Sequence, residues 1–139
     1  MNACLVDTNV FLDYFLGRDG FDDAKKILSR CENKIIDGFV SAHEVTTMSY
    51  YLEKGIKDRY KVIEIIAKTI KTFTIIETNE KTLGMALFSN VADYEDAVIE
   101  VSAMERNLDY IITKNIKDFT NSRVKAILPS EFLKLQGVV

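Results

Sequence analysis

The sequence predicts an α/β protein in which a parallel sheet of four or five strands carries helices on both faces. Short apolar runs typical of buried strands alternate along the chain with segments whose apolar residues recur at helical spacing. The length of 139 residues suits a single domain over 1–139. Apolar residues make up 47% and charged residues 28% of the chain, which is close to the globular average and excludes fibrous and disordered classes.

The first half of the chain predicts two strands, each followed by helical segments. The apolar run over 4–6 is typical of a short buried strand, and apolar residues at helical spacing over 21–31 predict a helix after it. A second strand is expected over 38–40, and a helix with one apolar face over 42–52. The apolar face of the next helix is predicted to comprise Tyr60, Ile63, Ala67 and Ile70.

The second half continues the alternation. Strands are expected over 73–76 and 110–112, and a helix over 79–89. The clearest stripe of apolar residues at helical period comprises Ala97, Val101, Met104 and Leu108. A weak strand over 124–127 and a short helix near 131–135 are expected to end the domain.

Several kinds of site are excluded by residues that the chain lacks. A single histidine rules out a His-rich zinc site, and no glycine-rich phosphate loop occurs. Cys4 and Cys31 cannot form a disulfide framework and fit a reducing, cytoplasmic setting. No apolar run approaches the roughly 20 residues of a membrane-spanning helix, and Asp7 interrupts the first apolar run, so neither a membrane segment nor a secretory leader is expected.

Carboxylates stand where the predicted strands end or the following helices begin. They are Asp7, Glu44, Asp93, Asp96 and Asp118. Because ligands of open α/β sheets bind beyond the carboxyl ends of the strands, we expect these side chains to lie at one edge of the sheet. Crowded carboxylates repel one another unless a cation neutralises them, and hard oxygen ligands suit Mg²⁺ or Mn²⁺. The cluster is therefore compatible with metal-assisted phosphodiester hydrolysis.

Each acid also has a purely structural interpretation as a helix cap. Ser41 and Glu44 form the S-x-x-E pattern of a capping box. Asp93 with Asp96 resembles an N-cap followed by an acid in the first turn, and Asp7 can cap a helix after the first strand. Helix starts need such caps almost everywhere, so the pattern alone leaves both interpretations open.

Four blocks of the sequence carry a family resemblance. They are Leu5–Asp13, Ser41–Glu44, Asp93–Val98 and Ile111–Phe119. In order and content they resemble the motifs of the PIN-domain family of metal-dependent ribonucleases, which includes the VapC toxins of toxin–antitoxin pairs. The resemblance covers nearly the whole chain. It implies a PIN-like three-layer α/β/α fold, one or two Mg²⁺ or Mn²⁺ ions, single-stranded or structured RNA as substrate with single-stranded RNA the usual one, a homodimer and a cognate antitoxin protein.

The resemblance also assigns roles to the acids. Asp7, Glu44 and Asp96 take the positions of the catalytic, metal-binding acids, with Asn9 as a polar support. Asp93 lies one helical turn before Asp96, so that it shares the metal or takes the place of Asp96.

The fourth block departs from the family pattern. Family members often carry Asp where this chain has Asn115, which can bind a metal through its carbonyl oxygen but removes one negative charge. Asp118 compensates for that charge, or else the fourth position is only polar; Thr113 is a further support. Lys114 and Lys117 flank the predicted site and are expected to contact substrate phosphates, because the net charge of −3 provides no general basic surface.

Three other interpretations compete with the nuclease. A phosphatase of the haloacid-dehalogenase type needs a second acid at the position of Asn9 and is discounted. A catalytically degenerate PIN-like module that binds RNA or protein is favoured by Asn115. A plain α/β domain would use all of its acids as caps and would keep the side chains of Asp7, Glu44 and Asp96 far apart.

Overall fold

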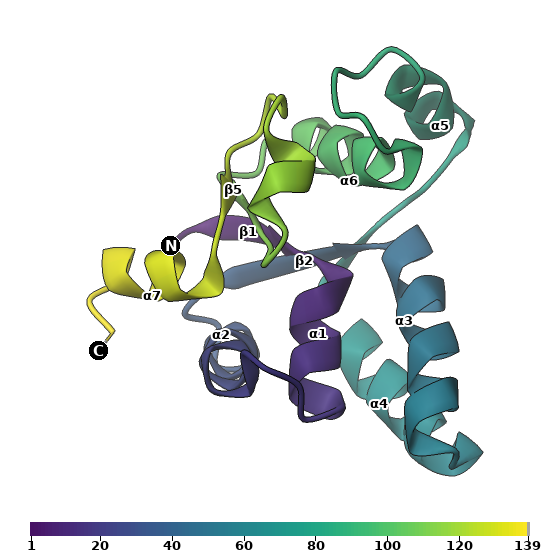
Figure 1. The fold of residues 1–139 in the computed structure, drawn as a ribbon, viewed down its shortest axis with the longest axis vertical. Helices are drawn as coiled ribbons and strands as arrows, with labels where there is room; N and C mark the ends of the chain where they lie inside the picture. The colour runs from purple at the N-terminus through teal and green to yellow at the C-terminus, as the bar shows by residue number, and fades with distance from the viewer. Residues whose placement is uncertain (139) are drawn as a thin grey trace.

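The computed structural model describes residues 1–138 and contains a five-stranded, all-parallel sheet in the order β3-β2-β1-β4-β5 between two layers of helices (Figure 1). The strands are β1 (Ala3–Val6), β2 (Asp37–Ser41), β3 (Thr74–Ile76), β4 (Tyr110–Ile112) and β5 (Ala126–Ile127). The predicted three-layer α/β/α fold is confirmed. Because all five strands run in the same direction, their carboxyl ends share one edge of the sheet.

The helices divide between the two faces of the sheet. One face is covered by α1 (Thr8–Phe15), α2 (Phe21–Glu32), α3 (Ala42–Ile56), α4 (Arg59–Thr72) and α7 (Pro129–Leu135). On the other side lie α5 (Glu80–Ala86), α6 (Tyr94–Glu105) and the short 3-10 helix η1 (Ile116–Phe119) (Figure 1). None of the helices formed by residues 1–138 is long and apolar enough to cross a membrane.

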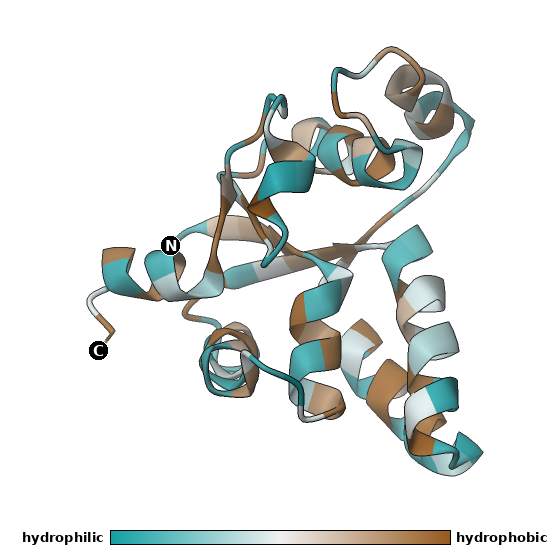
Figure 2. Ribbon diagram, in the orientation of Figure 1, coloured by the Kyte–Doolittle hydropathy of each residue, from teal (hydrophilic) through white to brown (hydrophobic). Residues whose placement is uncertain are grey.

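Strand β1 lies at the centre of the sheet and is buried on both faces. Cys4 and Val6 belong to the core under α1 to α4, whereas Leu5 packs with Ile99 and Ala103 of α6. This alternation follows from the two-residue period of a strand, and a strand buried on both faces becomes a continuous apolar run. Figure 2 shows the same distribution, with hydrophobic residues concentrated in the strands and on the inward sides of the helices.

The predicted apolar face of α4 is wrong. Tyr60 is 85% exposed and Ile63 51% exposed, whereas Val62 and Ile65 are buried. Both sets of residues have helical spacing, so periodicity cannot choose between them. The choice comes from packing, because the side of α4 that faces α1 and α3 carries the second set.

The stripe predicted for α6 is also incomplete. Every residue from Ala97 to Ala103 is buried, and Leu108 lies beyond the end of the helix. The helix has neighbours on two sides, since Ile99 packs toward the sheet while Val98 packs against Ala86 and Val91. A helix that is buried on two sides has no exposed polar face, so its sequence does not show a single apolar stripe.

Candidate active site

Asp7 occupies the point where β1 ends and α1 begins. Its Oδ1 accepts a hydrogen bond from the backbone N–H of Thr8 at 2.9 Å, and its Oδ2 accepts one from the hydroxyl of Thr113 at 2.8 Å. The backbone N–H of Asn115 in turn donates to the Thr113 hydroxyl at 3.0 Å. Burial raises the pKa of Asp7 above its ordinary value, although these two hydrogen bonds oppose the rise. The predicted supporting residue Thr113 thus touches the first acid directly.

Glu44 combines the two interpretations that the sequence left open. Its Oε1 accepts from the backbone N–H of Ser41 at 2.9 Å, and the Glu44 N–H donates to the Ser41 hydroxyl at 3.2 Å, which completes the capping box. Its Oε2 is buried and has no hydrogen-bond partner among residues 1–138. Burial, and then the nearby charge of Asp7, raise the pKa of Glu44 well above its ordinary value. Oε1 caps the helix, whereas Oε2 is buried without a hydrogen-bond donor among residues 1–138.

Asp93 and Asp96 take different positions at the start of α6. Asp93 is exposed and is the N-cap, accepting the backbone N–H of Asp96 at 3.1 Å. Asp96 is half-buried, and its pKa is raised to about 7 by burial first and then by the charges of Asp93 and Asp7. The two carboxylates are therefore not equivalent, and Asp96 is the one that faces the other acids.

An open pocket of about 290 Å³ lies where these segments meet. Of the residues singled out from the sequence, five line it: Asp7, Asn9, Asp96, Asn115 and Asp118. The remaining lining residues are Thr8, Leu12, Arg18, Thr47, Tyr51 and Glu95. The sequence did not assign any of them to the site, and the expectation that Glu95 points away from Asp96 is wrong. Thr8 and Glu95 adjoin Asp7 and Asp96 in the sequence, whereas the other four come from α1, α3 and the loop after α1, and no local pattern marks those four as neighbours of the acids.

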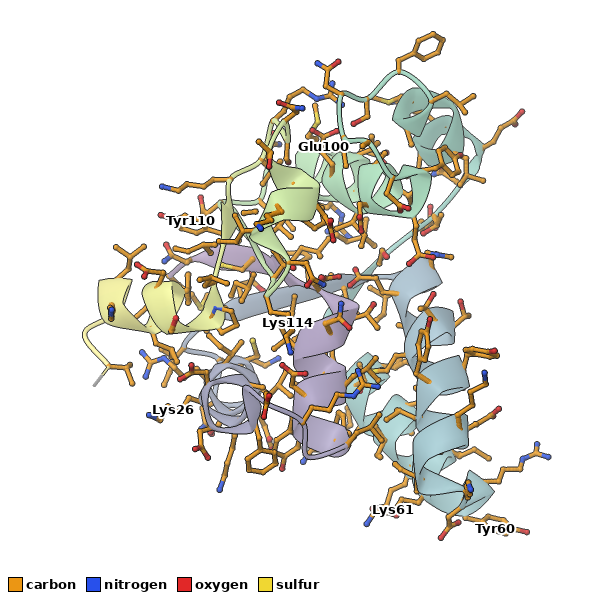
Figure 3. All side chains as sticks on the ribbon, in the orientation of Figure 1. Lys26, Tyr60, Lys61, Glu100, Tyr110 and Lys114 are labelled. Atoms are coloured by element: carbon orange, nitrogen blue, oxygen red, sulfur yellow. The ribbon has the colours of Figure 1, made fainter. Side chains whose placement is uncertain are left out.

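The side chain of Lys114 contacts Asp13 and Asp19 and does not line the acidic pocket. Its Nζ is 2.9 Å from Oδ2 of the buried carboxylate of Asp13, and it also donates to the backbone oxygen of Asp19 at 3.3 Å (Figure 3). Lys117 is exposed on η1 and does not line the pocket either. The side chain of Lys114 is thus already engaged in an ion pair within the protein.

Two ion pairs tie the surrounding segments together. Nε2 of His43 lies 3.2 Å from Oε2 of Glu95, joining the starts of α3 and α6. Farther along α6, the buried Glu100 accepts hydrogen bonds from Arg123 and from the hydroxyl of Ser89. Burial alone would raise the pKa of Glu100, but these hydrogen bonds outweigh it and hold the pKa below its ordinary value. The segments before α6 and β5 are therefore anchored to the same helix.

The carboxylate oxygens of the site are suitable ligands for a divalent metal ion. Within residues 1–138, no three side chains of His, Cys, Asp or Glu are gathered closely enough to hold an ion by themselves. Mg²⁺ nevertheless keeps several waters and commonly needs only one or two protein carboxylates. The unpartnered Oε2 of Glu44 and the raised pKa values of Asp7 and Asp96 indicate an excess of negative charge that a hard cation relieves. The oxygen donors therefore fit Mg²⁺ or Mn²⁺ in their chemistry.

Solved structures share this fold at low sequence identity. A toxin–antitoxin complex from Klebsiella pneumoniae is 24% identical, with a TM-score of 0.69 over 91% of this chain and 97% of that chain. VapBC2 from Rickettsia felis, bound to a DNA fragment from its promoter, is 15% identical, with a TM-score of 0.67 over 91% and 98%. VapC20 from Mycobacterium tuberculosis, described as a sarcin–ricin loop cleaving toxin, is 12% identical, with a TM-score of 0.63 over 78% and 86%.

Sequence comparison identifies the family. No curated protein sequence matches the chain. The sequence profile of the PIN domain, in contrast, matches residues 3–117, a span that includes the acids at the ends of β1 and β2 and at the start of α6. The resemblance carried by the four sequence blocks is thereby confirmed, and the chain belongs to the PIN-domain family.

Proposed function

We propose that the protein is a Mg²⁺- or Mn²⁺-dependent endoribonuclease and the toxin of a type II toxin–antitoxin pair. One observation carries the proposal. Asp7, Glu44 and Asp96 come from three separate segments, each has a raised pKa, and the charge of Asp7 contributes to the raised pKa of both Glu44 and Asp96. Burying like charges together without a partner is unfavourable, so the arrangement favours a function that brings a cation.

The chain's own residues suit hydrolysis of a phosphodiester. A divalent ion, when bound, would polarise a phosphoryl oxygen and lower the pKa of a water molecule. Asp7, Glu44 and Asp96 would hold it, with Asn115 and Asp118 as further oxygen donors in the pocket. Thr113 and Thr8 hold the carboxylate of Asp7 in one orientation, and Ser41 does the same for Glu44.

Asp96 would be ionised when the cation is bound. Its pKa of about 7 belongs to the metal-free protein, and a nearby cation favours the charged form of a carboxylate. Asp96 would orient the attacking water by accepting a hydrogen bond from it, and would not act as the nucleophile.

Cleavage of RNA at a series of Mg²⁺ concentrations tests this function. We expect Asp7→Asn and Asp96→Asn to lose cleavage by at least about a hundredfold, because each removes a charge at the proposed metal site. Asp93→Asn should keep most of the activity, since the Asp93 side chain serves as the cap of α6. Asp22→Asn, an exposed acid in the first turn of α2, is the matched control. Full cleavage by both Asp7→Asn and Asp96→Asn would remove the two acids from the reaction.

A second candidate function rests on Asn115. This side chain lines the pocket where the family pattern often has a carboxylate, so the site has one negative charge fewer. A catalytically degenerate PIN-like module that binds RNA or protein would tolerate that loss. Titration calorimetry with Mn²⁺ distinguishes the two candidates. Heat of binding that disappears in Asp7→Asn supports the metal enzyme, and no binding at millimolar Mn²⁺ supports the binding module.

The toxin role is tested in cells. Because similar solved structures are described as toxin–antitoxin complexes, we expect induction of this chain to arrest growth, and Asp7→Asn to abolish the arrest at equal expression. Normal growth with abundant folded protein would contradict the role. A homodimer and a cytoplasmic location stay predictions that sedimentation analysis and cell fractionation can check.

A further inference from the structure

The acidic pocket contains a cationic side chain that the sequence did not point to. Arg18 is the sole Lys or Arg among the lining residues in the described part of the chain, where it accompanies Asp7, Glu95, Asp96 and Asp118. Arg18 is exposed, and no hydrogen bond or ion pair of its guanidinium is found within residues 1–138. Lys114 differs from Arg18, because its ammonium group forms an ion pair with the carboxylate of Asp13.

The turn that presents Arg18 is held in place on both sides. The Arg18 N–H donates to the backbone oxygen of Asp13 at 3.0 Å, and the Arg18 carbonyl accepts from the Phe21 N–H at 3.1 Å. Lys114 adds a hydrogen bond to the backbone oxygen of Asp19. Gly20 has a φ of 92°, and a Cβ there would lie 2.7 Å from Oδ2 of Asp13. The turn therefore needs glycine at this position, and its backbone is organised before any ligand arrives.

An aromatic side chain lines the same pocket from α3. Tyr51 is 43% exposed, and its ring meets the ring of Tyr50 edge to face, with centroids 5.2 Å apart at an interplanar angle of 79°. Nζ of Lys54 lies 4.6 Å from the centroid of the Tyr50 ring on the same helix. The Tyr50 ring packs against one side of the Tyr51 ring, and the exposed part of Tyr51 provides a surface on which a nucleobase can stack.

We propose that Arg18 and Tyr51 bind the substrate strand, with the Arg18 guanidinium on a backbone phosphate and the Tyr51 ring against an adjoining unpaired base. The inference rests on the proposed function, and it assigns Arg18 and Tyr51 to the binding of the single-stranded RNA that the family resemblance implies. A guanidinium matches a phosphate with two parallel hydrogen bonds. A base inside a duplex is stacked on both of its neighbours and cannot reach a tyrosine, whereas an unpaired base can.

The negative charge of the pocket favours a cationic side chain, such as that of Arg18, for binding phosphate. Four carboxylates line it, so a phosphate approaching without a cation would be repelled. Arg18 offers an attraction that remains when the pocket holds no metal ion. Lys114 supports the turn that carries Arg18 through its contacts with Asp13 and Asp19, and a direct contact of Lys114 with substrate phosphate stays a prediction.

The test separates binding from cleavage. In an Asp96→Asn background, binding of a short unstructured RNA is measured at about 50 to 200 mM salt, and compared with the same RNA annealed to its complement. We expect Arg18→Gln to weaken binding of the single strand about tenfold and to reduce the salt slope of log K by about 0.7. Arg18→Lys should keep the salt slope.

Tyr51 is tested in the same assay. Tyr51→Leu should weaken binding about fivefold or more without changing the salt slope, and Tyr51→Phe should bind like the parent protein, because stacking needs the ring and not the hydroxyl. The matched controls are Arg59→Gln and Tyr60→Leu, at the first two positions of α4. Tyr60 lies at the end of this helix that is remote from the sheet (Figure 3). Both controls should bind like the parent.

The outcomes distinguish this inference from the nuclease proposal. An unchanged salt slope in Arg18→Gln, unchanged binding in Tyr51→Leu, or equal affinity for duplex and single strand would overturn the inference, as would failure of the parent to bind RNA. If the protein with Mg²⁺ cleaves RNA and both variants cleave equally well, the inference fails and the nuclease stands. If the protein binds RNA through Arg18 and Tyr51 but never cleaves it, the nuclease proposal fails and the binding surface stands.

Discussion

The two oxygens of the Glu44 carboxylate lie in different environments. Oε1 completes the cap of α3, and Oε2 is buried without a hydrogen-bond donor among residues 1–138. A helix cap alone does not explain a buried second oxygen whose pKa is raised by a neighbouring acid. The sequence posed capping and metal binding as alternatives, but one side chain has room for both, because a carboxylate has two oxygens that can serve different partners.

The substitution Glu44→Gln separates the capping role of Glu44 from the effect of its buried charge. The glutamine oxygen can still accept from Ser41, while the buried charge is removed, so we expect the free energy of unfolding of the metal-free protein at pH 8 to rise by about 1–2 kcal/mol. Glu44→Ala removes the cap contact as well and should lower it by about 1 kcal/mol. Urea denaturation measures both changes. A loss of stability in Glu44→Gln would mean that Glu44 serves only as a cap.

The raised pKa values predict an unusual dependence of stability on pH. Asp96 in the unfolded chain loses its proton near its ordinary pKa of 3.8, whereas in the folded protein it holds the proton until about pH 7. The folded state therefore binds more protons in this interval, and the free energy of unfolding should fall as pH rises from about 4 to 7.

Denaturation of the metal-free protein at a series of pH values checks this expectation. Asp96→Asn should flatten the decline and should be more stable than the parent at pH 8, on the order of 1 kcal/mol after allowance for solvent screening. Stability that rises steadily from about pH 4 to 7 in the parent would show that the acids are not crowded.

At the scale of elements, the segment after β4 is attached to α1 at two points. Thr113 donates to Asp7 at the start of α1, and one residue later Lys114 pairs with the buried Asp13 farther along the same helix. Two successive side chains thus hold the β4–η1 segment against α1, and the second also holds the turn with Arg18. Lys114 therefore has a structural role in this segment, and the phosphate contact that its place in the sequence suggested stays a prediction.

A double-mutant cycle tests this attachment. Lys114→Met leaves the buried carboxylate of Asp13 without its cation, and we expect a loss of about 2 kcal/mol in the free energy of unfolding. Asp13→Asn combined with Lys114→Met should restore part of that loss, because no buried charge is then left unpaired. Chemical denaturation of the single and double variants supplies the numbers. Losses that simply add would contradict a direct interaction.

At the scale of the whole molecule, a bound ion should couple the two halves of the chain. Asp7 and Glu44 belong to the first two strand–helix units, and Asp96 belongs to α6 on the opposite face of the sheet. A ligand that binds the folded state alone stabilises it by about 2.7 kcal/mol at a hundred times its dissociation constant. We therefore expect millimolar Mn²⁺ to raise the melting temperature of the parent protein.

The effect of Mn²⁺ should depend on the acids. Asp7→Asn with Asp96→Asn should melt at the same temperature with and without the ion, while Asp22→Asn should respond like the parent. Differential scanning calorimetry at several Mn²⁺ concentrations gives the comparison. A melting temperature of the parent that does not move with Mn²⁺ would contradict a metal site formed by the folded chain.

Local patterns were sufficient for much of the fold. All five strands lie where short apolar runs predicted them, and the caps of α3 and α6 lie where Ser41, Glu44 and Asp93 predicted them. Such features depend on neighbours a few residues away, so a single sequence contains them. Helix α1 was not placed by its pattern because it is short and begins directly after a buried strand.

Contacts between distant segments depended on the folded chain. The central position of β1 brings Asp7 near Asp96 and Asp118, while it directs Lys114 to Asp13 and leaves Arg18 and Tyr51 beside the acids. No short-range pattern distinguishes Arg18 from the other cations of the chain. The physical reason is that strand–helix crossovers determine which side chains share the carboxyl edge of the sheet, and a crossover joins residues that are remote in sequence.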